Sequence, residues 1–135
     1  MLAESRDRLA DALTAWLPET VAVYSYPPDT AAPPFAYLAP ARHSWRQGAI
    51  AMSWDVSLVL DGALTPASRA LELDQLFDLL LAACADVAIL AECSSSFGSQ
   101  LLGDISHPRV TVTVPMFHAT CELPQPAPAL TAVPH

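Results

Sequence analysis

Segment 50–61 constrains the fold most, because apolar residues alternate there with mostly small or polar ones over its whole length. Successive side chains of a β-strand point to opposite faces, so a period of two residues predicts a long strand. One face should pack on a core and the other should meet water or a partner. The apolar set is Ile50, Met52, Trp54, Val56, Leu58 and Leu60, and the other set is Ala51, Ser53, Asp55, Ser57, Val59 and Asp61.

A second alternating strand is predicted near the end of the chain, where Val110, Val112, Val114, Met116 and His118 share one face. Proline has no N–H to donate to a sheet, so Pro115 predicts an edge or a bulge in the later half of this strand. The other expected strands are Val21–Tyr26, Phe35–Leu38 and, with a weaker pattern, 88–96.

The connections between these strands carry their own signals. Segment 40–48 (PARHSWRQG) is polar between two apolar stretches, which indicates an exposed loop or a hairpin arm. Residues 97–100 are expected to form a loop, and Leu101–Ile105 to pair at a sheet edge.

Two helices are expected. Residues 2–17 place leucines and a tryptophan near one stripe and are stopped by Pro18. A second helix should start at Thr65-Pro66, an N-cap followed by a proline at the first helical position, and run to about Ala85. Its predicted buried stripe is Leu73, Leu76, Phe77, Leu80, Cys84 and Val87.

The order α-β-β-β-α-β-β predicts an α+β domain, with two helices packed on one face of a mostly antiparallel sheet of four to five strands. The length of 135 residues fits one domain, assigned to residues 1–123. Residues 124–135 are rich in proline and alanine and are expected to be an extended or disordered tail.

Charge and cysteine content narrow the function classes. The net charge of −8, with no lysine and six arginines, disfavours a protein that grips nucleic acid. Three cysteines without a close pair favour a reducing compartment. The sequence contains neither a predicted membrane span nor a signal-peptide pattern, so synthesis in the cytosol is expected.

No group of residues forms a recognised catalytic, cofactor or metal motif. Four glycines are too few and too scattered for a phosphate-binding loop. His118 and Cys121 could join Cys84 and Cys93 around zinc, but the paired spacing typical of zinc sites is missing. Cys93 or a serine of 94–96 could act as a nucleophile, but no elbow motif surrounds them. We therefore expect neither an enzyme nor a cofactor.

Surfaces are the remaining candidates for function. Arg42, Trp45 and Arg46 combine residue types that are enriched at interface hot spots, although an ordinary solvated loop explains them equally well. Long strands whose outer faces carry small residues rather than lysine and glutamate are poorly protected against association. The predicted interface residues are Arg42, Trp45, Arg46, Asp55, Ser57, Thr111 and Thr113.

The chain also resembles a known family. The resemblance spans about residues 1–120, in the order and spacing of MLAESRDRLADAL, AVYSY, PPDTAAPPFAYL, SWDVSLVL, ALTPASRALELDQLFDLLLAA and RVTVTVPM. These segments resemble the small tail-terminator, or tail-completion, proteins of long-tailed bacteriophages, a family of neck proteins. The tail after residue 123 has no counterpart in that family.

The resemblance implies a structural virion protein made in the host cytoplasm. Its subunits would form a ring, commonly a hexamer, that caps the tail tube and stops its polymerisation. The implied partners are copies of the chain itself, the major tail tube protein and the head-closure or connector protein. DNA would pass through the lumen without specific binding, and neither a cofactor nor a membrane would be involved.

Two alternatives stay open beside the tail terminator. The chain could be a head-closure subunit or another neck protein of the same particle. It could instead be a small cytosolic ligand-binding or regulatory α+β domain.

Overall fold

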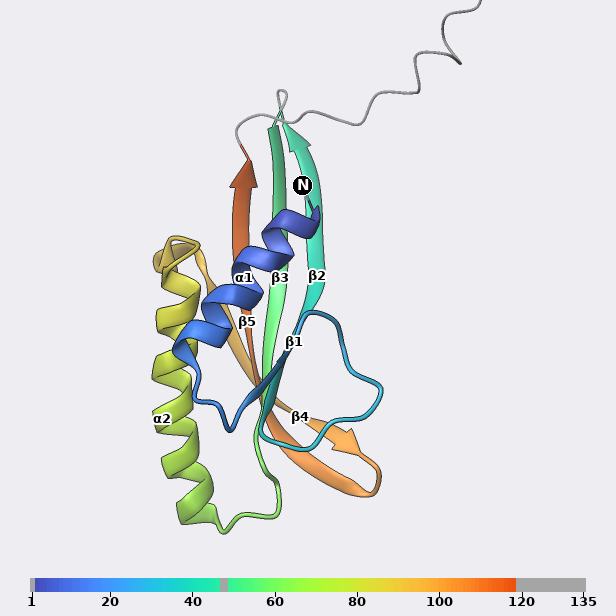
Figure 1. Cartoon of the computed structure of the whole chain (residues 1–135), viewed down its shortest axis with the longest axis vertical. Coiled ribbons are helices and arrows are strands. Elements are labelled where there is room, and N and C mark those ends of the chain that lie inside the picture. The colour runs from blue at the N-terminus through green and yellow to red at the C-terminus, as the bar shows by residue number, and fades with distance from the viewer. Residues whose placement is uncertain (1, 47–48, 119–135) are drawn as a thin grey trace, which may run out of the picture.

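The computed structural model describes residues 2–46 and 49–118 and confirms the predicted α+β class (Figure 1). The elements follow the predicted order, except that a short 3-10 turn, η1, is inserted between the second helix and the fourth strand. They are α1 (Leu2–Trp16), β1 (Ala22–Tyr24), β2 (Phe35–Arg46), β3 (Ala49–Val59), α2 (Pro66–Ala85), η1 (Leu90–Glu92), β4 (Ser94–Leu102) and β5 (Ile105–His118).

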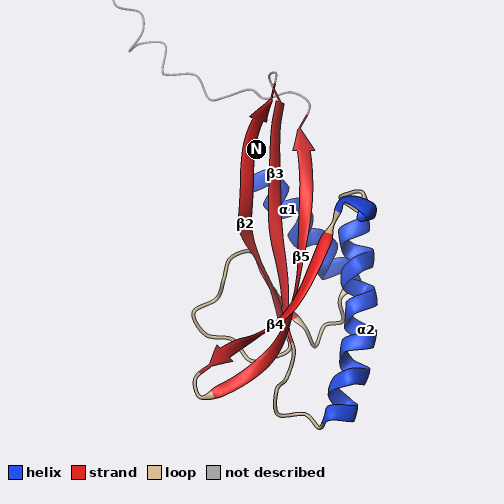
Figure 2. Ribbon diagram, turned by 180° about the vertical axis from the view of Figure 1, so that it is seen from behind, coloured by secondary structure: helices blue, strands red, loops and turns tan. Residues whose placement is uncertain are grey.

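The five strands form one mixed sheet in the order β1-β2-β3-β5-β4. Only β1 and β2 run parallel, and every other neighbouring pair is antiparallel. Figure 1 shows α1 crossing in front of the sheet and α2 running beside it, and the reverse view in Figure 2 shows a sheet face that no helix crosses. We call this second face the open face.

The main core lies between the helices and the sheet. Leu9 and Leu13 of α1 and Leu80 of α2 are fully buried against the apolar face of β3, where Trp54 and Val56 are also fully buried. The period of two in 50–61 therefore predicted the correct face of the central strand. Burying side chains of this size stabilises the fold by about 1.5–3 kcal/mol each, so this layer provides most of the driving force for folding.

The local signals at α2 are confirmed. The Thr65 hydroxyl accepts a hydrogen bond of 3.3 Å from the Ser68 N–H, and Pro66 occupies the first turn. The predicted stripe is only partly correct. Leu76, Leu80 and Cys84 are buried, as is the unpredicted Ala83, whereas Leu73, Phe77 and Val87 are half-buried at its border.

The prediction for the second strand was too short. β2 continues from Phe35 to Arg46, so of the two interpretations of 40–48, the hairpin arm is correct and the loop is not. A register shift between Pro40 and Arg42 accommodates the proline, and beyond it β3 supplies a partner as far as Arg46 opposite Ala49. The second half of β2 has only a weak strand pattern of its own. Its strand structure depends on pairing with β3, whose alternating pattern is strong. The first strand, predicted as Val21–Tyr26, is limited to Ala22–Tyr24.

The prediction for 88–100 was wrong in detail. Residues 90–92 form η1 rather than a strand, and 97–100 lie inside β4 rather than in a loop. β4 is the outer strand of the sheet, so the edge position expected for Leu101 is correct. A turn at Gly103, whose φ of 61° favours glycine, joins β4 to β5 and fixes their pairing.

Pro115 marks a sheet edge, as predicted. β4 begins at Ser94 opposite Thr113, so no described strand pairs with β5 beyond Thr113 on that side. We call residues 114–118 on that side the free edge of β5. The predicted domain boundary at 123 and the tail 124–135 lie outside the described residues. Within the described residues, the helices are too short or too polar to cross a membrane.

Candidate functional site

Four of the predicted interface residues meet on the open face as two cross-strand pairs. Asp55 stands opposite Thr113, and the Thr113 hydroxyl donates a hydrogen bond of 2.7 Å to Asp55 Oδ1. One step along the strands, the hydroxyls of Ser57 and Thr111 lie 3.0 Å apart. Ser57 is buried, and the other three are half-buried. The pairs therefore place hydroxyl and carboxylate groups side by side on the open face, and their role in assembly stays a prediction.

A second cluster on the open face was not indicated by the sequence patterns. Phe35, Tyr37 and Val59 are buried together, away from the main core, and the rings of Phe35 and Tyr37 are stacked with centroids 6.0 Å apart. The Tyr37 hydroxyl donates to Gln100 Oε1 at 2.9 Å, and Arg109 also donates to this oxygen. Phe35 and Tyr37 are two residues apart at the start of β2, so their side chains share one face. This spacing could have predicted the small core.

The outer edge of the sheet is unguarded. β4 contains no charged residue and no proline, and the structure describes no strand beside its outer edge. Two of its large apolar side chains face solvent, since Phe97 is 64% exposed and Leu101 is 69% exposed. The Phe97 ring lies 5.7 Å from the Phe77 ring of α2, so the helix covers this surface only in part. Natural edge strands usually carry lysine, proline or a bulge to prevent association, and β4 carries none of these residues.

The β4–β5 hairpin is anchored to the end of β3 by a close contact. Buried His107 accepts a hydrogen bond of 2.8 Å at Nδ1 from the N–H of Gly62. A Cβ atom at Gly62 would lie 2.4 Å from the carbonyl oxygen of Ser106, so only glycine fits here. This contact positions the exposed part of β4 relative to the core.

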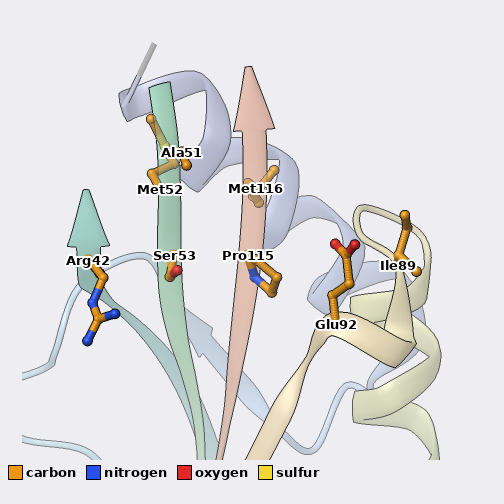
Figure 3. A pocket seen from close by; sticks show the side chains of 8 residues that line it. All are labelled: Arg42, Ala51, Met52, Ser53, Ile89, Glu92, Pro115 and Met116. Carbon is orange, nitrogen blue, oxygen red and sulfur yellow. The ribbon is translucent and has the colours of Figure 1, made fainter. Parts of the chain in front are cut away.

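The predicted Arg-Trp-Arg group is spread along β2. Arg42 is exposed, whereas the side chains of Trp45 and Arg46 lie outside the described part of the structure. Arg42 borders a groove of about 410 Å³ (Figure 3). Figure 3 shows Arg42 on one side, Pro115 near the middle, and Glu92 and Ile89 on the other side. The lining residues are Arg42, Ala51, Met52, Ser53, Ile89, Glu92, Pro115 and Met116.

The thiols of the described residues are poorly suited to nucleophilic chemistry. Burial, with a smaller effect of Cys93, raises the pKa of Cys84 to about 12. Burial and then the Glu92 charge raise the pKa of Cys93, so its thiol stays protonated at neutral pH. No three His, Cys, Asp or Glu side chains within the described ranges are arranged to hold a metal ion. Of the residues considered for zinc, Cys121 and the side chain of His118 lie outside the description.

Comparison of the chain with protein-family models and with curated proteins finds no match. A functional proposal therefore depends on the surfaces described above and on the resemblance noted for residues 1–120. Among the described strands, β4 carries two large apolar side chains that are more than half exposed, Phe97 and Leu101.

Proposed function

We propose that this chain is a structural subunit that assembles with copies of itself into a closed ring, as a tail terminator of a long-tailed bacteriophage. The observation that carries the proposal is the β4 edge. A nine-residue edge strand without a charge, with Phe97 and Leu101 exposed beside it, is an association surface. The opposite edge of the sheet is β1, which is only three residues long. The two edges therefore differ, which favours head-to-tail contacts of the kind that close into rings.

The edge alone does not provide a full interface. Stable protein interfaces bury about 1,200–2,000 Å² in total, which is more than one strand edge and two side chains supply. The open face continues from β4 onto β5 and adds a polar surface that includes Thr111 and Thr113, on the opposite side of the sheet from Phe97. In the proposed ring, β4 and the neighbouring part of the open face contact the next subunit.

The proposed ring caps the finished tail tube and joins it to the head connector. Its partners are the major tail tube protein and the connector or head-closure protein, and its place is the virion. The net charge of −8 suits a ring through which DNA moves, because it gives phosphates no dense cationic surface to bind. Neither catalysis nor a cofactor belongs to this function.

The assembly is tested by native mass spectrometry and negative-stain microscopy of the purified chain. We expect closed rings with a mass several times 14.4 kDa. Leu101→Asp places a charge at the β4 edge and should reduce the ring to monomers. Leu71→Asp is the matched control, because Leu71 is 59% exposed on α2, away from that edge. Rings that survive Leu101→Asp, or a monomer that binds no tail tubes, would contradict the proposal.

A second experiment separates the tail terminator from a head-closure protein. A phage whose gene for this chain is inactivated should make tails of irregular, excessive length if the chain stops tube growth. Tails of normal length that fail to join heads would instead indicate head closure. Electron microscopy of the lysate distinguishes the two results.

The groove beside Arg42 is the observation that favours the other candidate, a small ligand-binding domain. Its volume of about 410 Å³ is within the size range of ligand pockets, and Arg42 and Glu92 offer opposite charges. A stable monomer whose melting temperature rises with a small ligand, and loses that response in Arg42→Ala, would support this alternative over the ring.

A further inference from the structure

A single row of apolar side chains crosses all five strands on the side of the sheet that faces the helices. The cross-strand partners in this row are Phe97 of β4, Val110 of β5, Leu58 of β3, Ala36 of β2 and Val23 of β1. The three inner residues are fully buried. The two outer ones are not, since Phe97 is 64% exposed and Val23 is half-buried. The row is therefore sealed in its middle and open at both edges of the sheet.

The β1 end of the row lies beside a hollow of about 280 Å³. The residues that line this hollow are Thr14, Leu17, Pro18, Glu19, Val21 and Val23. Leu17, Val21 and Val23 also belong to the main core or pack against it, so the hollow opens on the helix side of the sheet. Phe97 faces the same side, because its ring lies 5.7 Å from the Phe77 ring of α2. The two ends of the row thus carry an exposed aromatic side chain and a largely apolar hollow, and aromatic side chains gain most when they fill such hollows.

The strand directions allow the two edges of the sheet to pair with each other in separate copies. β1 is parallel to β2, and three antiparallel steps lead from β2 to β4, so β4 runs opposite to β1. β4 of one copy can therefore join β1 of another as an antiparallel neighbour, which is the pairing that dominates the sheet. β1 lies at the front in Figure 1 and β4 at the front in the reverse view of Figure 2, so the two edges face opposite directions. Each edge is thus open to a different neighbour.

We propose that β4 of one subunit pairs with β1 of the next and places Phe97 in the hollow beside Val23. This inference rests on the proposed function and names the surface that receives the β4 edge. Pairing in this register continues the apolar row from one subunit into the next at the same level along the strands. Such a contact suits a ring, because a displacement along the strands at each step would give an open helix instead. Both edges of the sheet are covered once the ring has closed.

Two variants that each alter one side of the contact test this pairing. Phe97→Asp places a charge on the β4 side, and Thr14→Asp places one at the hollow, where Thr14 is exposed on α1. Each should raise the protein concentration at which rings form by about tenfold or more, because docking would bury an unpaired charge. Ala15→Asp is the matched control, since Ala15 is also exposed but does not line the hollow, and its rings should form as in the unmodified chain. Thermal unfolding checks that all three variants are folded.

Mixing the two variants gives the decisive measurement. Phe97→Asp retains its β1 side and Thr14→Asp retains its β4 side, so the mixture should form a one-to-one dimer of twice 14.4 kDa that cannot grow into a ring. Native mass spectrometry with one variant isotope-labelled detects this dimer. Rings that persist in Thr14→Asp, or a mixture that stays monomeric, would overturn the pairing, while rings of the unmodified chain would still support the proposed function. An unmodified chain that forms no ring would overturn the proposed function and this inference with it.

Discussion

Thr113 on β5 donates a hydrogen bond of 2.7 Å to Oδ1 of Asp55, which stands directly opposite it on β3. The contact joins two strands that are far apart in the sequence, at the middle of the open face. A carboxylate acceptor makes such a bond stronger than one between neutral groups. The open face is therefore held in its register by side chains as well as by the backbone.

Replacing Thr113 with valine should lower the free energy of unfolding by about 1.5 kcal/mol, because it removes the hydroxyl that Asp55 accepts from while keeping the shape. Urea denaturation measures the loss. Thr113→Ser retains the hydroxyl and should cost less. Equal losses in both variants would show that the methyl group, rather than the hydrogen bond, matters.

Gly62→Ala should destabilise the chain by about 2 kcal/mol or more, because the new Cβ atom would collide with the backbone carbonyl of Ser106. Gly98→Ala is the control, since no atom lies within 4 Å of the position that its Cβ would take. Thermal unfolding of both variants gives the comparison. A small effect at Gly62 would mean that the β4–β5 hairpin shifts freely.

The two helix ends are joined by a hydrogen bond from Trp16 Nε1 to Asp86 Oδ2. Trp16→Phe keeps most of the ring but removes the donor, and should cost about 1 kcal/mol of unfolding free energy. Asp86→Asn keeps an acceptor oxygen and should cost less. Urea denaturation of both variants decides whether the indole N–H or the ring area holds α1 to the end of α2.

The buried Cys84 thiol should make stability fall at alkaline pH. Burial raises its pKa from 9.0 to about 12, so the unfolded chain releases this proton at a lower pH than the folded chain. The stabilisation is complete below pH 9 and is lost between pH 9 and 12, by up to about 1.4 kcal/mol per pH unit. Cys84→Ala lacks this thiol, so the stability difference between it and the unmodified chain should narrow from pH 8 to 10. A constant difference would contradict the assignment.

Alanine replacements of Arg42, Trp45 and Arg46 should weaken assembly while leaving the melting temperature nearly unchanged. The reason is that Arg42 is exposed and that arginine and tryptophan often dominate interface energies. Sedimentation velocity reports assembly, and thermal unfolding reports stability. A parallel loss of both would assign these residues to the fold instead.

The sequence predicted well those elements whose own residues show a clear pattern, such as alternation or a helix cap. β3 and β5 alternate over most of their length, and α2 has both a cap and a proline at its start. β4 and the second half of β2 lack such patterns, because serines, a proline and polar residues occupy them. Their strand structure depends on pairing with β5 and β3, and such partners are far apart in the sequence.

The candidate surfaces were predictable in part for the same reason. Because side chains two apart in a strand share a face, the sequence predicted that Asp55 and Ser57 lie on one face of their strand. The same rule predicted that Thr111 and Thr113 share a face of theirs. The residue that stands opposite Asp55 depends on the register between β3 and β5. Asp55 and its partner Thr113 are 58 residues apart, so no local pattern predicts this pairing. The exposure of Phe97 and the groove beside Pro115 depend on where β4 begins, and no local pattern specifies that position.

The central position of β3 has a consequence for the order of folding. Its β2 side can be filled early, because only two residues separate the two strands in the sequence. Its other side waits for β5, which follows after α2 and β4, and closing such a long loop is slow. During synthesis one edge of β3 therefore stays unpaired until β5 has emerged from the ribosome. An unpaired strand edge at that stage favours aggregation.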